Sequence, residues 1–236
     1  NINSDPHIII ILPTHSTVHL RNDSTGGDCT TVGSWIGSTL TCALTQNIVG
    51  TVEINDGNIT LDGGGHSISG PVSYGIFIFG ASNVTIKNVT ISGFDIGVYS
   101  SFSGSNTFSD DRILGNVMGQ YSFELNSSTI RNNEISGNSR NGLFLIGIGS
   151  NNNSIIGNTI SSNGDGSALS SGLHVSANSS SNTVIDSNTL DSNVGSGLIL
   201  ISRGQFDQFD YQVSNNDIKN TVGVGIDIRV SYFSGT

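Results

Sequence analysis

The side chains that could do chemistry in this chain are a few scattered carboxylates. Hydrolysis of a glycosidic bond uses two carboxyl groups that face each other across a sugar, about 5 to 10 Å apart. Asp186 and Asp191 lie on the two sides of an expected turn at Thr189 and Leu190, and Glu134 lies further upstream. These three carboxylates are the catalytic candidates. The alternative for each of them is an ordinary surface carboxylate exposed to solvent.

Other acidic pairs are weaker candidates for the same kind of site. Asp110 and Asp111 are adjacent, so in a strand they would point to opposite faces and at most one would face outward. Asp227 lies two residues from Arg229. Chemistry on uronic acids needs a base together with a cation or Arg that neutralises the carboxylate. Calcium is therefore expected only if the protein is a lyase, and the sequence otherwise predicts no cofactor.

Histidine spacing does not predict a metal site. His15 and His19 are four residues apart and share one face of a strand, but no third ligand lies near them. His174 occupies an outward position of an alternating segment. We therefore predict no metal-binding site.

One loop combines aromatic and acidic side chains. It spans residues 202–211 and contains Phe206, Asp207, Phe209, Asp210 and Tyr211. Aromatic faces beside carboxylates suit sugar rings or a cation, and binding residues often lie on irregular loops of a rigid scaffold. This loop is the predicted carbohydrate-binding site, and the alternative is a surface loop that covers an open edge.

The composition favours an uncharged protein rich in strands and turns. Only 11% of the 236 residues are charged, and 38 Ser, 31 Gly and 27 Asn dominate the chain. Eight basic residues against eighteen acidic ones disfavour nucleic acid as a partner, because phosphate binding needs Lys and Arg. The longest apolar run, residues 8–12, is too short to span a membrane.

A repeat organises the chain. The kernel Asn-x-Ile-x-x-Asn occurs at residues 133–138 and 158–163, and related copies follow at 188–193 and 216–221. Each kernel is followed by a Gly and alternating apolar residues, so each repeat holds three short strands separated by turns. The kernel places one aliphatic residue in each repeat, at intervals of 22 to 30 residues: Ile68, Ile91, Ile113, Ile135, Ile160, Leu190 and Ile218.

Such a repeat is expected to stack as the coils of a solenoid. Each strand would pair with its equivalent in the next coil, so the aliphatic residues would form an internal column. The kernel asparagines would form stacked turns whose side-chain amides bond to one another. In this arrangement Glu134 lies two coils before Asp191, on the same side.

The repeat resembles that of the right-handed parallel β-helix proteins with pectate-lyase-type repeats, over residues 50–230. The resemblance implies an all-β, single-domain β-solenoid, here of about eight to nine coils of 22 to 30 residues. It does not define an activity, because members of this family include polysaccharide lyases, hydrolases and epimerases as well as tail spikes, adhesins and surface-layer components.

The cysteines and glycosylation motifs favour an extracellular or cell-surface protein. Cys29 and Cys42 are expected to form a disulfide within an N-terminal strand and cap region, residues 1–49, which precedes the repeats of residues 50–236. The chain starts at Asn1 rather than Met, which suggests that a leader has been removed. The Asn-x-Ser/Thr motifs are glycosylation candidates: Asn22, Asn58, Asn83, Asn88, Asn126, Asn152 and Asn178.

We therefore expect an extracellular structural or adhesive β-solenoid. The apolar segments at both ends of the sequence suggest self-assembly end to end, into a filament or a surface layer. A polysaccharide is the other expected partner. The alternative is a polysaccharide-active enzyme: a uronate polysaccharide lyase, an epimerase or a glycoside hydrolase.

Overall fold

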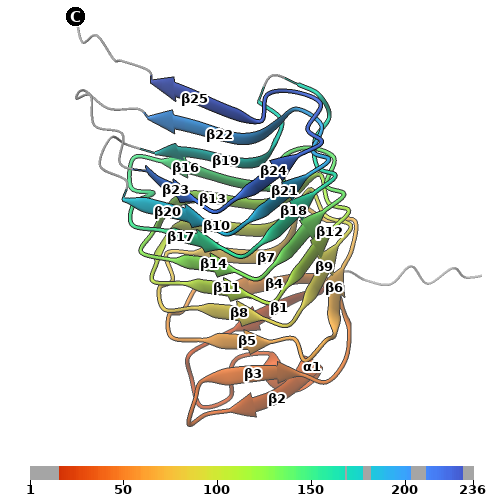
Figure 1. Ribbon diagram of the computed structural model, residues 1–236. Coiled ribbons are helices and arrows are strands. Elements are labelled where there is room, and N and C mark those ends of the chain that lie inside the picture. Colours follow the sequence, from red (N-terminus) through yellow and green to blue (C-terminus); the bar gives the residue numbers. More distant parts are fainter. Residues whose placement is uncertain (1–15, 168, 178–181, 203–210, 231–236) are drawn as a thin grey trace, which may run out of the picture.

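The protein is a parallel β-solenoid, as the repeat predicts (Figure 1). The computed structural model describes residues 16–167, 169–177, 182–202 and 211–230. The strands line three sides of the solenoid, called here sheets A, B and C, of which A and C are joined through β4. The chain visits them in the order B, C, A in every coil. The turns between these sheets stack at three corners.

Each sheet is built from one strand per coil. Sheet A contains β1 (Ser16–Leu20), β4 (Ile48–Ile54), β7 (Tyr74–Phe79), β10 (Ile96–Gly104), β13 (Met118–Asn126), β16 (Leu143–Gly147), β19 (Ser171–Ala177), β22 (Ser196–Ser202) and β25 (Ile226–Val230). Sheet B contains β2 (Gly33–Ile36), β3 (Thr41–Leu44), β5 (Thr60–Asp62), β8 (Thr85–Lys87), β11 (Thr107–Ser109), β14 (Thr129–Arg131), β17 (Ser154–Ile156), β20 (Thr183–Asp186) and β23 (Tyr211–Ser214). Sheet C contains β6 (Ser67–Ser69), β9 (Thr90–Ser92), β12 (Arg112–Leu114), β15 (Glu134–Ser136), β18 (Thr159–Ser161), β21 (Thr189–Asp191) and β24 (Asp217–Lys219), and the start of β4 pairs with β6.

The predicted aliphatic column is the inner face of sheet C. Strand pairing places its members directly above one another, from Ile68 through Ile91 to Ile218. Ile68, Ile91 and Ile135 have no solvent-exposed surface. Burial of such side chains supplies the main driving force for folding, at about 25 cal/mol per Å² of apolar surface.

The kernel asparagines form two buried ladders, in which the side-chain amides bond to one another as predicted. At the corner between sheets B and C, the Asn133 side chain donates to Asn158 Oδ1 (3.0 Å), and Asn158 donates to Asn188 Oδ1 (2.9 Å). At the corner between sheets C and A, Asn138 donates to Asn163 in the same way (2.8 Å). These amides satisfy backbone groups that the turns leave unpaired in the interior.

A glycine that follows a kernel can make room for the neighbouring ladder, as Gly119 shows. A Cβ on Gly119 would lie 2.9 Å from Asn138 Nδ2 and 2.8 Å from Ile135 Cγ2. A side chain at this position would displace the asparagine ladder.

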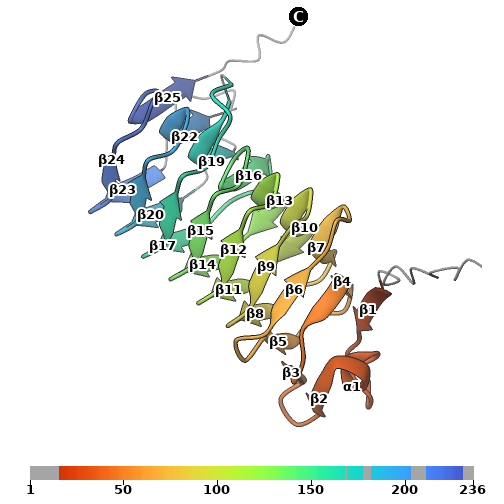
Figure 2. The ribbon, with the colours of Figure 1, turned by 90° about the vertical axis from the view of Figure 1, so that its right-hand side faces the viewer.

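A cap closes the N-terminal end of the solenoid (Figure 2). It contains the short helix α1 (Cys29–Val32) and the antiparallel pair β2–β3. Because these residues form a cap, about seven complete coils remain between β5 and β25, fewer than the eight to nine expected from the sequence. No helix among the described residues is long and apolar enough to cross a membrane.

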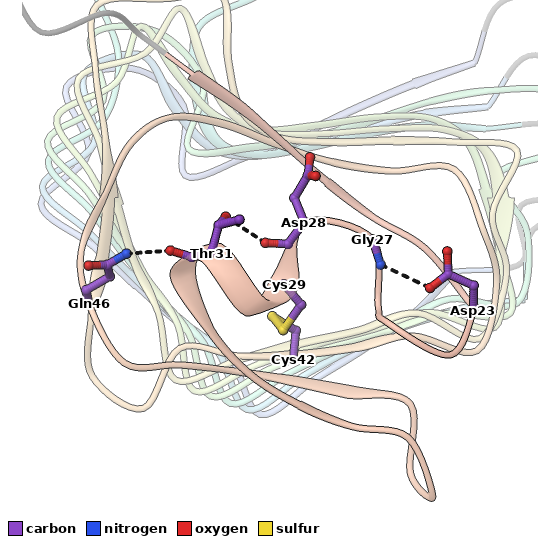
Figure 3. The surroundings of a disulfide bond; sticks show 7 residues. All are labelled: Asp23, Gly27, Asp28, Cys29, Thr31, Cys42 and Gln46. Atoms are coloured by element: carbon purple, nitrogen blue, oxygen red, sulfur yellow. Dashed lines mark hydrogen bonds between the residues drawn. A yellow bond between two sulfur atoms is a disulfide. The ribbon is translucent and has the colours of Figure 1, made fainter.

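The predicted disulfide between Cys29 and Cys42 joins α1 to β3 (Figure 3). Both cysteines are fully buried. Replacing both with Ala should lower the free energy of unfolding by about 3 kcal/mol, because the crosslink restricts the unfolded chain and Cys29 packs in the core. Urea denaturation of the variant and the oxidised parent measures this difference. An unchanged midpoint would show that the cap does not contribute to the cooperative unfolding of the coils.

Candidate functional site

The three predicted catalytic carboxylates do not form a common site. Asp186 ends β20 on sheet B, whereas Asp191 and Glu134 belong to strands of sheet C, two coils apart. Thr189 and Leu190, expected in a turn, belong to β21. The sequence analysis placed Thr189 and Leu190 in a turn because the kernel contains both a corner and a strand within only six residues.

Each of these carboxylates is held in its ionised form by local donors. Glu134 accepts a hydrogen bond from Arg112 Nε at 2.8 Å, which lowers the pKa of the Glu134 carboxyl. Ser214 Oγ and Asn215 Nδ2 donate to Asp186, which lowers its pKa. A hydrogen bond from Asn220 lowers the pKa of Asp191 in the same way. None of the three is suited to be the protonated acid of a glycosidase near neutral pH.

Asp110 and Asp111 do not lie in a strand. Asp110 occupies the corner between sheets B and C with a left-handed backbone (φ 61°). Asp111 points into the interior and is only 2% exposed. Burial raises the pKa of the Asp111 carboxyl to about 8. The side chain belongs to the asparagine ladder and has no route to a substrate.

Of the predicted carbohydrate-binding residues, Phe206, Asp207, Phe209 and Asp210 lie outside the described residues. Tyr211 is described and starts β23. Its hydroxyl accepts a hydrogen bond from Ala177 N and donates one to Ile201 O, both at 3.2 Å. Tyr211 therefore ties sheet B to sheet A.

The histidines considered as metal ligands do not lie together in the structure. His19 Nδ1 lies 3.4 Å from Glu53 Oε2 at the surface of the first coils. His174 is on the outward side of sheet A, as predicted, but it is only 2% exposed and packs against Phe144. His15 lies outside the described residues. Within the described part of the chain, no three His, Cys, Asp or Glu side chains gather where they could hold a metal ion.

The outward face of sheet A carries a column of aromatic rings that the sequence analysis did not identify as a feature. Strand pairing stacks Phe77, Tyr99, Tyr121 and Phe144 on successive coils. The first three rings are nearly parallel, with centroids 5.3 and 5.7 Å apart. Because their faces cover one another, these rings present mainly their edges to solvent. The signal was present in the sequence, since each of these residues follows a repeat glycine by two positions.

A second aromatic group ends this face, at the corner where the chain passes from sheet A to sheet B. Phe102 contacts Phe79 of the preceding coil and Phe123 of the following coil, with centroids 5.9 and 5.2 Å apart and planes at 80° and 81°. In this edge-to-face arrangement neither neighbour stacks parallel to the ring of Phe102. Its side chain is 56% exposed.

The backbone of Phe102 is left-handed, with φ of 49°. Strand pairing aligns Phe102 with Gly80 in the coil before and with Glu124 and Gly147 in the coils after, and all four have positive φ. Glycine adopts this conformation at no steric cost, whereas a bulky side chain there is an outlier that costs about 1–2 kcal/mol.

Glu124 stands beside Phe102 on the next coil. A Cβ on Gly149 would lie 2.5 Å from Glu124 Oε2, so the glycine leaves room for the carboxylate. Among the described residues, Glu124 makes no hydrogen bond or ion pair through its side chain. We define the aromatic corner as Phe79, Phe102, Phe123 and Glu124: an exposed aromatic ring and, on the next coil, a carboxylate without a hydrogen-bond or ion-pair partner among the described residues.

Residues 50–218 match the family model described as the right-handed β-helix region. This range covers more than half of the chain and contains the aromatic corner. No curated protein matches the chain.

Proposed function

Since the chain belongs to the right-handed β-helix family, its coils form a rigid scaffold, and we propose that the protein is an extracellular adhesive module that binds a neutral polysaccharide at the aromatic corner. Phe102 carries this proposal. The position requires a left-handed backbone, which two aligned coils satisfy with Gly80 and Gly147. Keeping an exposed phenylalanine there is unfavourable for folding, and strain of this kind concentrates at ligand-binding sites.

The chemistry of the corner suits a sugar. One face of a pyranose ring presents C–H groups, which pack against the electron-rich face of an aromatic ring. The carboxylate of Glu124 can accept hydrogen bonds from sugar hydroxyls, and such charge-assisted bonds are stronger than neutral ones. An aromatic platform with a few polar groups is the usual composition of a small-ligand site.

The charge of the protein favours a neutral saccharide. The formal net charge is −10, and Glu124 places a negative charge at the corner itself. A uronate polymer would be repelled by both. The buried disulfide at the cap supports an oxidising, extracellular location.

A polysaccharide-active enzyme remains the alternative. Binding is favoured because the candidate carboxylates are ionised, paired and distributed over two sheets. Release of reducing sugars or unsaturated products during a binding experiment would support the enzyme instead.

Head-to-tail assembly also stays a proposal. Val222, Val224 and Ile228 of the last described coil are 76%, 56% and 58% exposed. The cap, however, closes the core at the N-terminal end, so a second copy would have to dock onto the outside of α1 and β2. Light scattering over a range of concentrations tests this assembly: a mass that stays at 24.6 kDa would contradict it.

The polysaccharide proposal is tested by Phe102→Asn. Asparagine tolerates the left-handed backbone but removes the ring, so the coil should stay folded while affinity falls at least tenfold. Electrophoresis through gels containing soluble β-glucan, xylan, galactomannan or polygalacturonate measures binding of protein produced in bacteria. We expect a neutral polymer, and not polygalacturonate, to retard the parent protein.

Leu40→Asn is the matched control. Leu40 also has a left-handed backbone (φ 49°), but it lies in the turn between β2 and β3. This variant should bind like the parent. Equal retardation of the parent and Phe102→Asn, or no retardation by any neutral polymer, would overturn the proposal.

A further inference from the structure

The glycosylation motifs are distributed unevenly around the solenoid. All six described motif asparagines are exposed. Five of them lie along the corner where the chain passes from sheet A to sheet B, which we call the A–B edge: Asn22, Asn58, Asn83, Asn126 and Asn152. Asn88 lies at the corner between sheets B and C. Asn178 falls between β19 and β20 in the sequence but outside the described residues.

Strand pairing and hydrogen bonds establish this alignment. Asn58 and Asn83 each stand two residues before paired residues, Thr60 and Thr85, and Asn83 Nδ2 lies 3.2 Å from Asn58 Oδ1. Asn22 precedes the repeats in the sequence, but its side chain donates to Gly57 O at 3.1 Å, which places it at the same edge.

Asn126 and Asn152 continue the edge over the later coils. Asn126 ends β13, and Asn152 stands two residues before β17. Asn152 therefore lies on the coil after that of Asn126, on the same side of the solenoid.

Turn chemistry alone does not explain this distribution. Asn58, Asn83 and Asn152 have left-handed backbones, and so do Ser105 and Ser127 at the same edge, so the corner does not need asparagine. At the other corners Asn88, Asn132, Asn215 and Asn220 are also left-handed, and of these only Asn88 is part of a glycosylation motif. Asn126 belongs to a motif without a left-handed backbone.

We propose that the A–B edge is the N-glycosylated side of the protein. In the reaction, Asn Nδ2 forms a bond to C1 of a sugar carried on a lipid phosphate. The bond between C1 and the phosphate oxygen breaks, the lipid phosphate leaves with the bonding electrons, and the amide loses one proton. An oligosaccharide activated on a lipid phosphate is therefore the required co-substrate.

The spacing of the coils limits how many glycans the edge carries. Paired strands are about 4.8 Å apart, which is close to the width of one sugar ring. Asn58 and Asn83 lie on adjacent coils and their side chains are hydrogen-bonded to each other. One molecule should therefore carry a glycan on Asn58 or on Asn83, not on both.

Peptide mapping of the protein isolated from its natural source tests the proposal. Trypsin releases residues 22–87, which contain Asn22, Asn58 and Asn83, and residues 113–131, which contain Asn126. We expect glycan mass on both peptides, with at most two glycans on residues 22–87. Unmodified edge peptides, or modification confined to Asn88 in residues 88–112, would overturn the proposal.

A second measurement tests whether the folded edge accepts sugar. Folded protein from bacteria is incubated with a purified oligosaccharyltransferase and its lipid-linked donor. We expect modification of residues 113–131 in the parent and none in Asn126→Gln; an unmodified peptide in the parent would contradict exposure of the edge. The polysaccharide assay uses protein without glycans, so failure of either proposal is seen separately.

Discussion

Replacing Asp111 by Asn should raise the free energy of unfolding by several kcal/mol at pH 8 and change it little at pH 4. Asp111 occupies an asparagine position in the ladder between sheets B and C. Its Oδ1 accepts a hydrogen bond from Val89 N at 3.1 Å, and its own N–H donates to Asn133 Oδ1. In the following coils, Asn133 Nδ2 donates to Phe108 O and Asn158 Nδ2 donates to Ile130 O. A carboxylate cannot donate at this place, whereas a carboxylic acid or an amide can.

The sign of the pH dependence follows from the number of protons that the folded and the unfolded chain bind at Asp111. Burial raises the pKa of folded Asp111 to about 8, far above the ordinary carboxyl value of 3.8. Between these two pH values the folded protein holds one proton more than the unfolded chain. The free energy of unfolding therefore falls as pH rises through this window, by up to about 1.4 kcal/mol per pH unit. The Asp111→Asn variant lacks this contribution.

Urea denaturation at pH 4, 6 and 8 measures the difference between the two proteins. Other titrating groups contribute equally to both, so the difference isolates Asp111. Asp110→Asn is the control, because Asp110 is its exposed neighbour at the corner. This variant should keep most of the pH dependence of the parent, because burial raises the pKa of Asp111 more than the charge of Asp110 does. Parallel pH profiles for the parent and Asp111→Asn would mean that the buried carboxyl is not protonated in the folded state.

Replacing Asn158 by Ala should lower the free energy of unfolding by at least about 3 kcal/mol. Asn158 is 1% exposed and lies in the middle of the same ladder. Its side chain donates to Ile130 O and Asn188 Oδ1, both at 2.9 Å, and accepts from Asn133 N and Nδ2, both at 3.0 Å. Alanine leaves Ile130 O and the Asn133 donors without these partners in the interior, and each unsatisfied buried group costs about 1–3 kcal/mol.

Chemical denaturation with Asn55→Ala as the control measures this effect. Asn55 is exposed, and its side chain bonds only to Glu53 among the described residues, so its removal should change the free energy of unfolding by less than 1 kcal/mol. A similarly small loss in Asn158→Ala would show that water replaces the ladder bonds.

The aromatic corner and the A–B edge lie close together, so glycans on the edge would lie near the proposed polysaccharide site. Phe123 and Asn126 are three residues apart on β13, so a glycan on Asn126 would flank the corner. The glycans would keep this side hydrated, and the open ring of Phe102 would remain the apolar contact.

The sequence by itself determined the solenoid. The kernel repeats, and periodicity is a local property, so the spacing of Ile113, Ile135 and Ile160 was enough to predict parallel coils and an internal column. The disulfide was predictable for a similar reason, because few cysteines leave few pairings. The number of coils was overestimated because α1 and the antiparallel β2–β3 pair carry no repeat signal.

Only the tertiary structure decided which side chains meet. Phe79, Phe102 and Phe123 lie on three successive coils, and their contact depends on the register between strands and on the positive φ of Phe102. The raised pKa of Asp111 likewise depends on its burial, because a sequence gives the type of a side chain but not its surroundings. A repeat fixes what recurs in every coil, whereas a binding site is made by the positions where one coil departs from its neighbours.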